Sequence, residues 1–104
     1  MKPVRDPEYL RFIRGQPCCV CGRTWGIEAA HTGPRGLGQK ASDHSCIPLC
    51  WKHHRTGRDS YHTLGRVTFS EAHSLDIAAA ISMLNLVYSA IGVSRSAGTD
   101  GTLR

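Results

Sequence analysis

The 104-residue chain is poor in acidic side chains and has no apolar run long enough to span a membrane. Eight Asp and Glu stand against 13 Lys and Arg, which gives a net charge of +5 at pH 7. The segment from Met1 to Pro7 is charged and has no apolar stretch, so we expect no secretory signal and a cytoplasmic location. The excess of positive charge weakly favours a polyanion such as nucleic acid as partner.

Cysteine occurs five times, an odd number in an arrangement that does not indicate a disulfide framework. Cys18 and Cys21 form a C-x-x-C pair, and Cys50 and His53 form a C-x-x-H pair after 28 intervening residues. Two such pairs bring four ligands to a tetrahedral zinc ion. A small core gains much stability from a metal staple. We therefore predict a structural zinc site made of these four residues, with Cys19 outside it because its side chain is one residue out of phase.

The remaining pattern predicts one α+β domain over residues 1–92. Asp6 and Pro7 indicate the start of a short N-terminal helix, and Gly15 its end. One short strand is expected within residues 24–30 and a second within residues 41–50. A short helix follows the second strand directly, which gives a ββα order around the predicted metal.

A long apolar helix is expected from Ser70, as its N-cap, to about Ile91. The three residues before Ser70 are predicted to be an isolated extended piece. Apolar side chains nearly encircle the helix, so we expect it to be largely buried, in part by a second subunit. A homodimer through residues 70–91 is therefore one expected partnership. Gly92 is expected to end the helix, and residues 93–104 to form a disordered tail.

The segment that follows the first predicted strand combines glycines with two cations, Arg35 and Lys40. Gly33, Gly36 and Gly38 allow the backbone to approach a phosphate closely, and the cations can hold a phosphodiester. The segment lacks the G-x-x-x-x-G-K-[ST] pattern of a nucleotide-binding loop. A solvated flexible loop is the alternative interpretation.

A histidine at a strand end, His31, a polar turn, and His54 on the following helix together resemble the ββα-metal finger of HNH nucleases. The sequence is more closely similar to the phage and prophage branch related to recombination-enhancement nucleases. Three stretches carry this similarity, within about residues 9 to 80: Ile27-Glu28-Ala29-Ala30-His31-Thr32-Gly33, Gln39-Lys40-Ala41-Ser42-Asp43, and Ile47-Pro48-Leu49-Cys50-x-x-His53-His54-Arg55.

The resemblance implies a role for each motif position. His31 would be the general base that activates water, and His54 a ligand of a catalytic divalent ion. Ser45 stands where the family has Asn, so Asp43 is the better candidate for the middle, orienting position. His62 would be a further ligand of the catalytic ion, which would be Mg²⁺ or Mn²⁺, with Zn²⁺ as the alternative.

The expected reaction is metal-dependent hydrolysis of DNA phosphodiester bonds. One divalent ion can neutralise the scissile phosphate and assist the leaving oxygen, while a neutral imidazole accepts a proton from water. Five basic residues are expected to follow the DNA backbone without reading bases: Arg35, Lys40, Arg55, Arg58 and Arg66. The resemblance also implies a bacterial host cell as the location and a phage or host recombination protein as partner.

Two other functions fit the same sequence. A non-catalytic zinc-finger module would bind DNA with His31 in a structural role and without a second metal ion. A protein-interaction module would dimerise through residues 70–91 and have no affinity for nucleic acid. A second zinc site also remains open, because four further ligand-type residues are present: His44, Cys46, His62 and His73.

Overall fold

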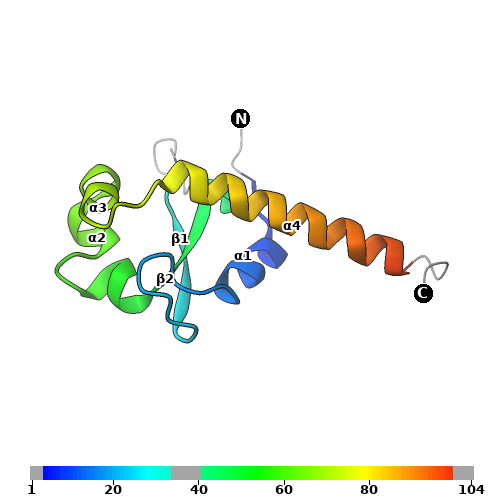
Figure 1. The fold of residues 1–104 in the computed structure, drawn as a ribbon, viewed down its shortest axis with the longest axis horizontal. Coiled ribbons are helices and arrows are strands. Elements are labelled where there is room, and N and C mark those ends of the chain that lie inside the picture. Colours follow the sequence, from blue (N-terminus) through cyan, green and yellow to red (C-terminus); the bar gives the residue numbers. More distant parts are fainter. Residues whose placement is uncertain (1–3, 34–40, 100–104) are drawn as a thin grey trace.

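Two short antiparallel strands form the centre of the fold (Figure 1). β1 (Ile27–His31) and β2 (Cys46–Cys50) pair in a register that places Ile27 opposite Cys50 and His31 opposite Cys46. The computed structural model describes residues 4–33 and 41–99, and its side chains as far as residue 92. Arg35 and Lys40, predicted to contact phosphate, lie outside the described residues. The predicted α+β class is confirmed.

Helices cover this hairpin and create two apolar clusters. All five residues of β2 are buried, because packing elements lie on both sides of the strand. One cluster gathers Ile47, Leu49 and Phe69 with Ile77, and the other joins Cys46 to Tyr9 and Ile13. Packing in these two clusters therefore fixes both strands, and with them the strand ends that carry His31 and Cys50.

The N-terminal helix α1 (Pro7–Arg14) has the predicted boundaries. The Asp6 side chain accepts a hydrogen bond from the Tyr9 amide, and the Gly15 amide bonds back to the last turn. A capping carboxylate followed by proline at the first helical position specifies this start locally. Burial of Tyr9 and Ile13 fixes the helix against β2.

The segments around β2 are short helical turns. The 3₁₀ turn η1 (Asp43–Ser45) precedes it, and the wide π-helical turn η2 (Lys52–Thr56) follows it. Two further helices, α2 (Tyr61–Leu64) and α3 (Arg66–Ala72), then lead to the long helix α4 (Ile77–Thr99). The predicted order of two strands followed by a short helical segment is present, and that segment, η2, ends at Thr56.

The predicted single helix over residues 70–91 is wrong in three respects. Residues 66–72 already form α3, so the stretch before Ser70 is helical and not extended. Ser74 has a φ of 49°, which breaks the helix, and the Asp76 carboxylate then receives the Ala79 amide at 2.9 Å as a new N-cap. Gly92 does not end α4, which continues to Thr99, so residues 93–99 of the predicted tail are helical.

The prediction that this helix is largely buried is also wrong for the described chain. α4 extends along one side of the domain and projects beyond it (Figure 1). Its large apolar residues Met83 and Leu86 are 60% and 67% exposed. Among the described residues no single helix has the length and composition to cross a membrane; α3 and residues 77–92 meet that criterion only together, as a pair bent by 90°.

Candidate metal centre and histidine pocket

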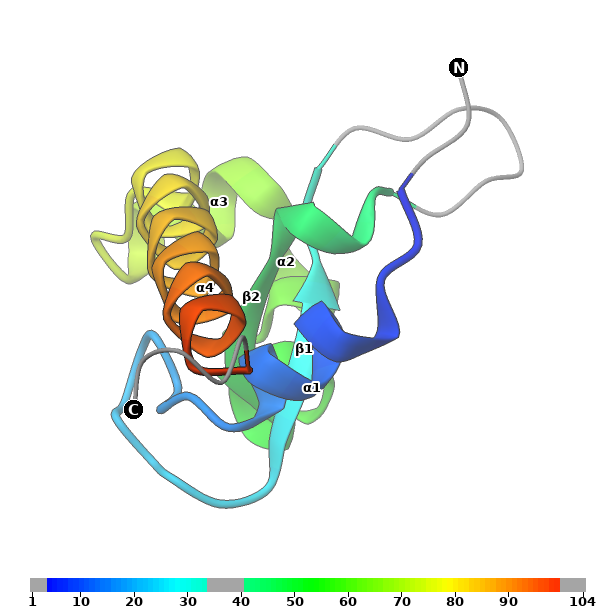
Figure 2. The same ribbon diagram turned by 90° about the vertical axis from the view of Figure 1, so that its right-hand side faces the viewer.

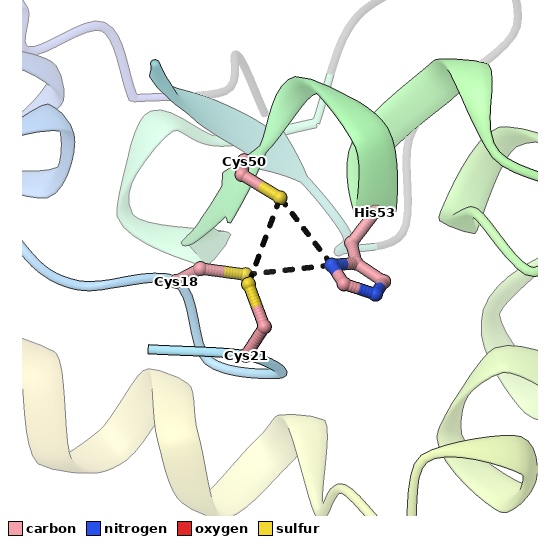
Figure 3. A group of neighbouring side chains, drawn as sticks. All are labelled: Cys18, Cys21, Cys50 and His53. Carbon is pink, nitrogen blue, oxygen red and sulfur yellow. Dashed lines mark hydrogen bonds between the residues drawn. The ribbon is translucent and has the colours of Figure 1, made fainter. Parts of the chain in front are cut away.

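Four side chains, from the Cys18–Cys21 loop, the end of β2 and η2, converge into one Cys3His cluster, as predicted (Figure 3). The ligand-type atoms of Cys18, Cys21, Cys50 and His53 all lie within 4.8 Å of one another. The Cys21 and Cys50 sulfurs are 3.9 Å apart, and His53 Nδ1 lies 3.3 Å from Cys50 Sγ and 4.0 Å from Cys18 Sγ. Ligands at about 2.3 Å around a tetrahedral zinc ion stand ~3.8 Å apart. The cluster can therefore hold a metal ion such as zinc.

The backbone around the Cys18–Cys21 turn favours metal binding by these two cysteines. Gly22 adopts a φ of 77°, which favours glycine and closes the turn. Burial opposes ionisation of Cys18, but hydrogen bonds from backbone amides, that of Val20 among them, hold the pKa of its thiol below the ordinary value. A thiol that ionises readily is a suitable metal ligand.

The other two cysteines stand outside the cluster. Burial raises the pKa of Cys19 to about 11 and that of Cys46 to about 12, so both remain neutral thiols. Cys46 packs with Tyr9 and Ile13 in the core. The structure therefore agrees with the predicted exclusion of Cys19.

His31 is held by the carboxylate of Asp43. His31 Nε2 and Asp43 Oδ1 are 2.8 Å apart, and Asp43 also receives Arg5 Nη1 at 2.9 Å and the Asp6 amide at 2.7 Å. Burial raises the pKa of Asp43, but these hydrogen bonds outweigh it and leave the pKa below its ordinary value. Asp43 thus stays a carboxylate and fixes the orientation of the His31 imidazole through Nε2.

Ser45, the other candidate for the middle position, makes hydrogen bonds to the backbone and none to His31 among the described contacts. Its hydroxyl donates to the Ser42 carbonyl at 2.6 Å and accepts the Gly33 amide at 3.2 Å. A Cβ on Gly33 would lie 2.6 Å from that hydroxyl, so glycine is needed for this close approach. Ser45 therefore ties the chain after β1 to η1, while Asp43 reaches His31.

His54 has a matching arrangement with Glu28. His54 Nδ1 lies 2.8 Å from Glu28 Oε1, and Arg55 binds both carboxylate oxygens, with its Nη2 at 2.7 Å from Oε2. The hydrogen bonds from Arg55 above all, and from His54, lower the pKa of Glu28 to about 2. Burial lowers the pKa of His54, so its imidazole is neutral near pH 7 with Nε2 available.

These histidines face one open pocket of about 560 Å³. His31 enters from the end of β1 and His54 from η2, while α2 contributes His62, whose ring centre is 4.7 Å from that of His54. The remaining lining residues are small or aromatic: Ala29, Gly33, Ala41, Tyr61 and Gly65. The structure therefore brings together the three histidines that the resemblance singled out, with Asp43 behind His31.

Within residues 4–33 and 41–92, only the Cys3His set brings three or more such ligand atoms together. The four residues considered for a second zinc site are dispersed. His44 pairs with Asp6 at 2.9 Å, and His73 packs against Phe69 and bonds to the Asp59 carbonyl. In the described part of the chain these residues do not form a second cluster, and His62 instead lines the pocket with His54.

The predicted DNA-backbone residues differ in their surroundings. Arg58 is exposed, whereas Arg66 donates a hydrogen bond to the Thr32 carbonyl beside His31. Arg55, 54% exposed, pairs with Glu28. For Arg55 and Arg66 the structure thus adds a contact that supports the pocket, and their contact with DNA stays a prediction.

Sequence reasoning missed several supports of the pocket. Glu28, which pairs with His54 and Arg55, is not among the predicted site residues. Arg5, on Asp43, and Tyr61, in the pocket wall, were not considered at all.

Comparison with known proteins identifies the family of this chain. Residues 1–90 match the model of a family described as a protein of unknown function, DUF968. The chain belongs to the DUF968 family. The match includes every residue of the Cys3His cluster and of the histidine pocket.

One curated relative of this DUF968 chain is the uncharacterized protein YdfU of Escherichia coli K12. The two are 40% identical over 50 residues, which is 45% of this chain and 14% of YdfU. The DUF968 chain thus spans only a small part of that relative. No solved structure gives a significant match.

Proposed function

We propose that this DUF968 protein is a metal-dependent endonuclease of the HNH type that hydrolyses DNA phosphodiester bonds. The observation that supports this most is the convergence of His31, His54 and His62 on one pocket, beside the Cys3His cluster. Two of the three imidazoles are each held by a carboxylate, which is how catalytic and metal-binding histidines are commonly oriented. A ββα-metal finger is the proposed identity of the β1, β2 and η2 unit.

In this proposal His31 is the general base. Its Nε2–H donates to Asp43, so Nδ1 is the nitrogen that takes the proton from the attacking water. Asp43 is the orienting residue, and its carboxylate also stabilises the imidazolium that forms. Arg5 and the Asp6 amide keep that carboxylate in position.

His54, through Nε2, and His62 would hold the catalytic divalent ion, with Mg²⁺ or Mn²⁺ favoured over Zn²⁺. Such an ion supplies charge neutralisation on the phosphate and assistance to the leaving oxygen. Glu28 orients His54 from behind, and Arg55 keeps Glu28 ionised. His54 suits this role because a neutral imidazole backed by a carboxylate is a usual metal ligand, and the oxygen ligands that Mg²⁺ or Mn²⁺ prefers would come from water and the phosphate.

The Cys3His cluster is proposed to hold a structural zinc. Its ligands join the Cys18–Cys21 loop to the end of β2 and to η2, the segment that carries His54. Fixing this junction would place the pocket histidines relative to one another. Partners proposed from the sequence are DNA, a second copy of the chain through the exposed side of α4, and a phage or host recombination protein.

A plasmid-cleavage assay tests the proposed activity. Zinc-loaded protein is incubated with supercoiled plasmid and Mg²⁺, Mn²⁺ or no added ion, with one further sample containing EDTA. We expect nicked or linear product only where Mg²⁺ or Mn²⁺ is present. Binding of the plasmid without cleavage under every ion would instead support the DNA-binding module without catalysis.

A further inference from the structure

We propose that Trp25, Arg23 and Trp51 form a stacking site for an unpaired base of single-stranded DNA. The choice of DNA as ligand rests on the proposed function, whereas the site itself is separate from the histidine pocket. None of the three residues lines that pocket. Single-stranded DNA is a form of nucleic acid that the chemistry of the pocket alone does not select.

The three side chains form a cation–aromatic stack at the surface. The guanidinium carbon of Arg23 lies 4.4 Å from the ring centre of Trp25 and 5.4 Å from that of Trp51. Trp25 is 63% exposed and Trp51 is 38% exposed. Tryptophan is normally well buried, so two tryptophans with open surface on one arginine are a feature that fold stability does not require.

The stack is mounted on the same framework as the Cys3His cluster. Trp25 precedes β1 and Trp51 follows β2, and the register brings these two strand ends together. The Trp51 amide bonds to the Gly26 carbonyl at 3.2 Å, and the Cys18 amide bonds to the Arg23 carbonyl at 2.9 Å. A rigid aromatic surface of this kind loses little entropy when a ligand stacks on it.

Gly26 allows the close packing that sets the position of Trp51. Its φ is 65°, and a Cβ at this position would lie 2.9 Å from Cδ1 of the Trp51 ring. The ring therefore lies directly over the backbone of the loop that carries Trp25 and Arg23. Its orientation is set by the fold and does not depend on a ligand.

The chemistry of the stack suits a nucleobase with its phosphate. Bases of any sequence stack on tryptophan faces, and arginine adds cation–π attraction and charge for the phosphate. Arg23 Nη1 is buried and has no hydrogen-bond partner among the described residues, so this guanidinium is not fully used within the fold. Lys52, directly after Trp51, is exposed and adds a second positive charge. An acidic peptide would engage the cations but not the open ring faces.

The form of DNA follows from access to the bases. In a duplex each base is covered by its neighbours, so an aromatic side chain at the surface meets no free face. An unpaired base can lie on Trp25 with its sugar-phosphate directed to the cations. Trp51 immediately precedes η2, the turn that carries His54. A DNA strand stacked on Trp51 would therefore lie near the segment that positions His54.

The test is binding of a fluorescent oligo-dT and of a duplex of equal length to the zinc-loaded full chain, without added Mg²⁺ or Mn²⁺. Trp25→Leu removes the ring but keeps an apolar side chain, and Trp25→Phe restores an aromatic face. We expect Trp25→Leu to weaken oligo-dT binding about 5- to 100-fold, with duplex binding nearly unchanged. Trp25→Phe should recover much of the affinity. Val67→Ala, at an apolar position 69% exposed on α3, is the matched control and should change neither.

Zinc content and the salt dependence of binding are measured on the same samples. Trp25→Leu should keep its zinc and leave the slope of affinity against salt unchanged, because no phosphate contact is removed. The proposal is overturned by unchanged oligo-dT affinity, by equal losses for oligo-dT and duplex, or by release of zinc, which would make the ring a cover for the cluster. The readout involves no cleavage, so a chain that binds as expected but cuts no plasmid refutes the nuclease proposal and leaves this one standing.

Discussion

Replacement of Cys50 by serine should release the metal and unfold the domain. Cys50 is fully buried, and its sulfur is 3.3 Å from His53 Nδ1 and 3.9 Å from Cys21 Sγ. In a domain this small, metal binding and folding are one equilibrium, so losing a ligand costs several kcal/mol. Domains of this kind have only about 5–15 kcal/mol of stability in total. Thermal unfolding followed by circular dichroism, with elemental analysis for zinc, measures both effects.

Cys19→Ser is the matched control for this experiment. Cys19 is the neighbour of Cys18 but lies outside the cluster and stays a neutral thiol. This variant should keep one zinc per chain and a transition close to that of the wild type. If Cys50→Ser keeps both the zinc and the transition, or if wild-type protein purified without chelator contains no zinc, the cluster is not a structural metal site.

His31→Ala should slow DNA cleavage about 10²- to 10⁴-fold, the usual contribution of a positioned general base. The side chain is 26% exposed in the pocket and outside the Cys3His cluster, so zinc content and the thermal transition should stay near wild-type values. DNA affinity should also be retained. Single-turnover cleavage with protein in excess isolates the chemical step from binding and product release.

His44→Ala is the matched control for His31→Ala. His44 also pairs with an aspartate, Asp6, at 2.9 Å, but it does not line the pocket. Its removal should leave the cleavage rate within a small factor of wild type. Release of zinc and unfolding in His31→Ala would assign His31 a structural role and contradict its assignment as the base.

Features set by neighbouring residues in the chain were predictable from the sequence. The start of α1 depends on Asp6 and Pro7, which act within one turn. The Cys3His cluster follows from two short spacings, because each pair needs only a tight turn to present two ligands. Both strands were also placed within a few residues of their observed bounds.

Features set by distant contacts were not predictable in the same way. The break between α3 and α4 was also missed, although the features that make it are local: the positive φ of Ser74 and the hydrogen bond from the Ser70 hydroxyl to the Leu75 carbonyl, five residues on. Apolar periodicity continues through this break and so gives no sign of it. Burial of Phe69 in the core requires α3 to exist, and that requirement arises only once β2 is in place.

The candidate pocket was predictable in part from the sequence. The resemblance supplied His31, His54 and His62, with Asp43 as the candidate for the orienting position, but it did not indicate the pairing of Glu28 with His54. Asp43 meets His31 across 12 residues, and Glu28 meets His54 across 26. Such pairs depend on the strand register and on the position of η2, which no local pattern contains.

The dependence of plasmid cleavage on Mn²⁺ concentration, compared between wild type and His54→Ala at equal zinc content, tests most directly whether the pocket carries the chemistry. We predict that both proteins keep their zinc. The wild type should cleave with saturable dependence on Mn²⁺, and His54→Ala should need more Mn²⁺ and reach a lower rate, because one ligand of the catalytic ion is gone. A wild type that cleaves at no Mn²⁺ concentration, or a His54→Ala curve that coincides with that of the wild type, would contradict the proposal.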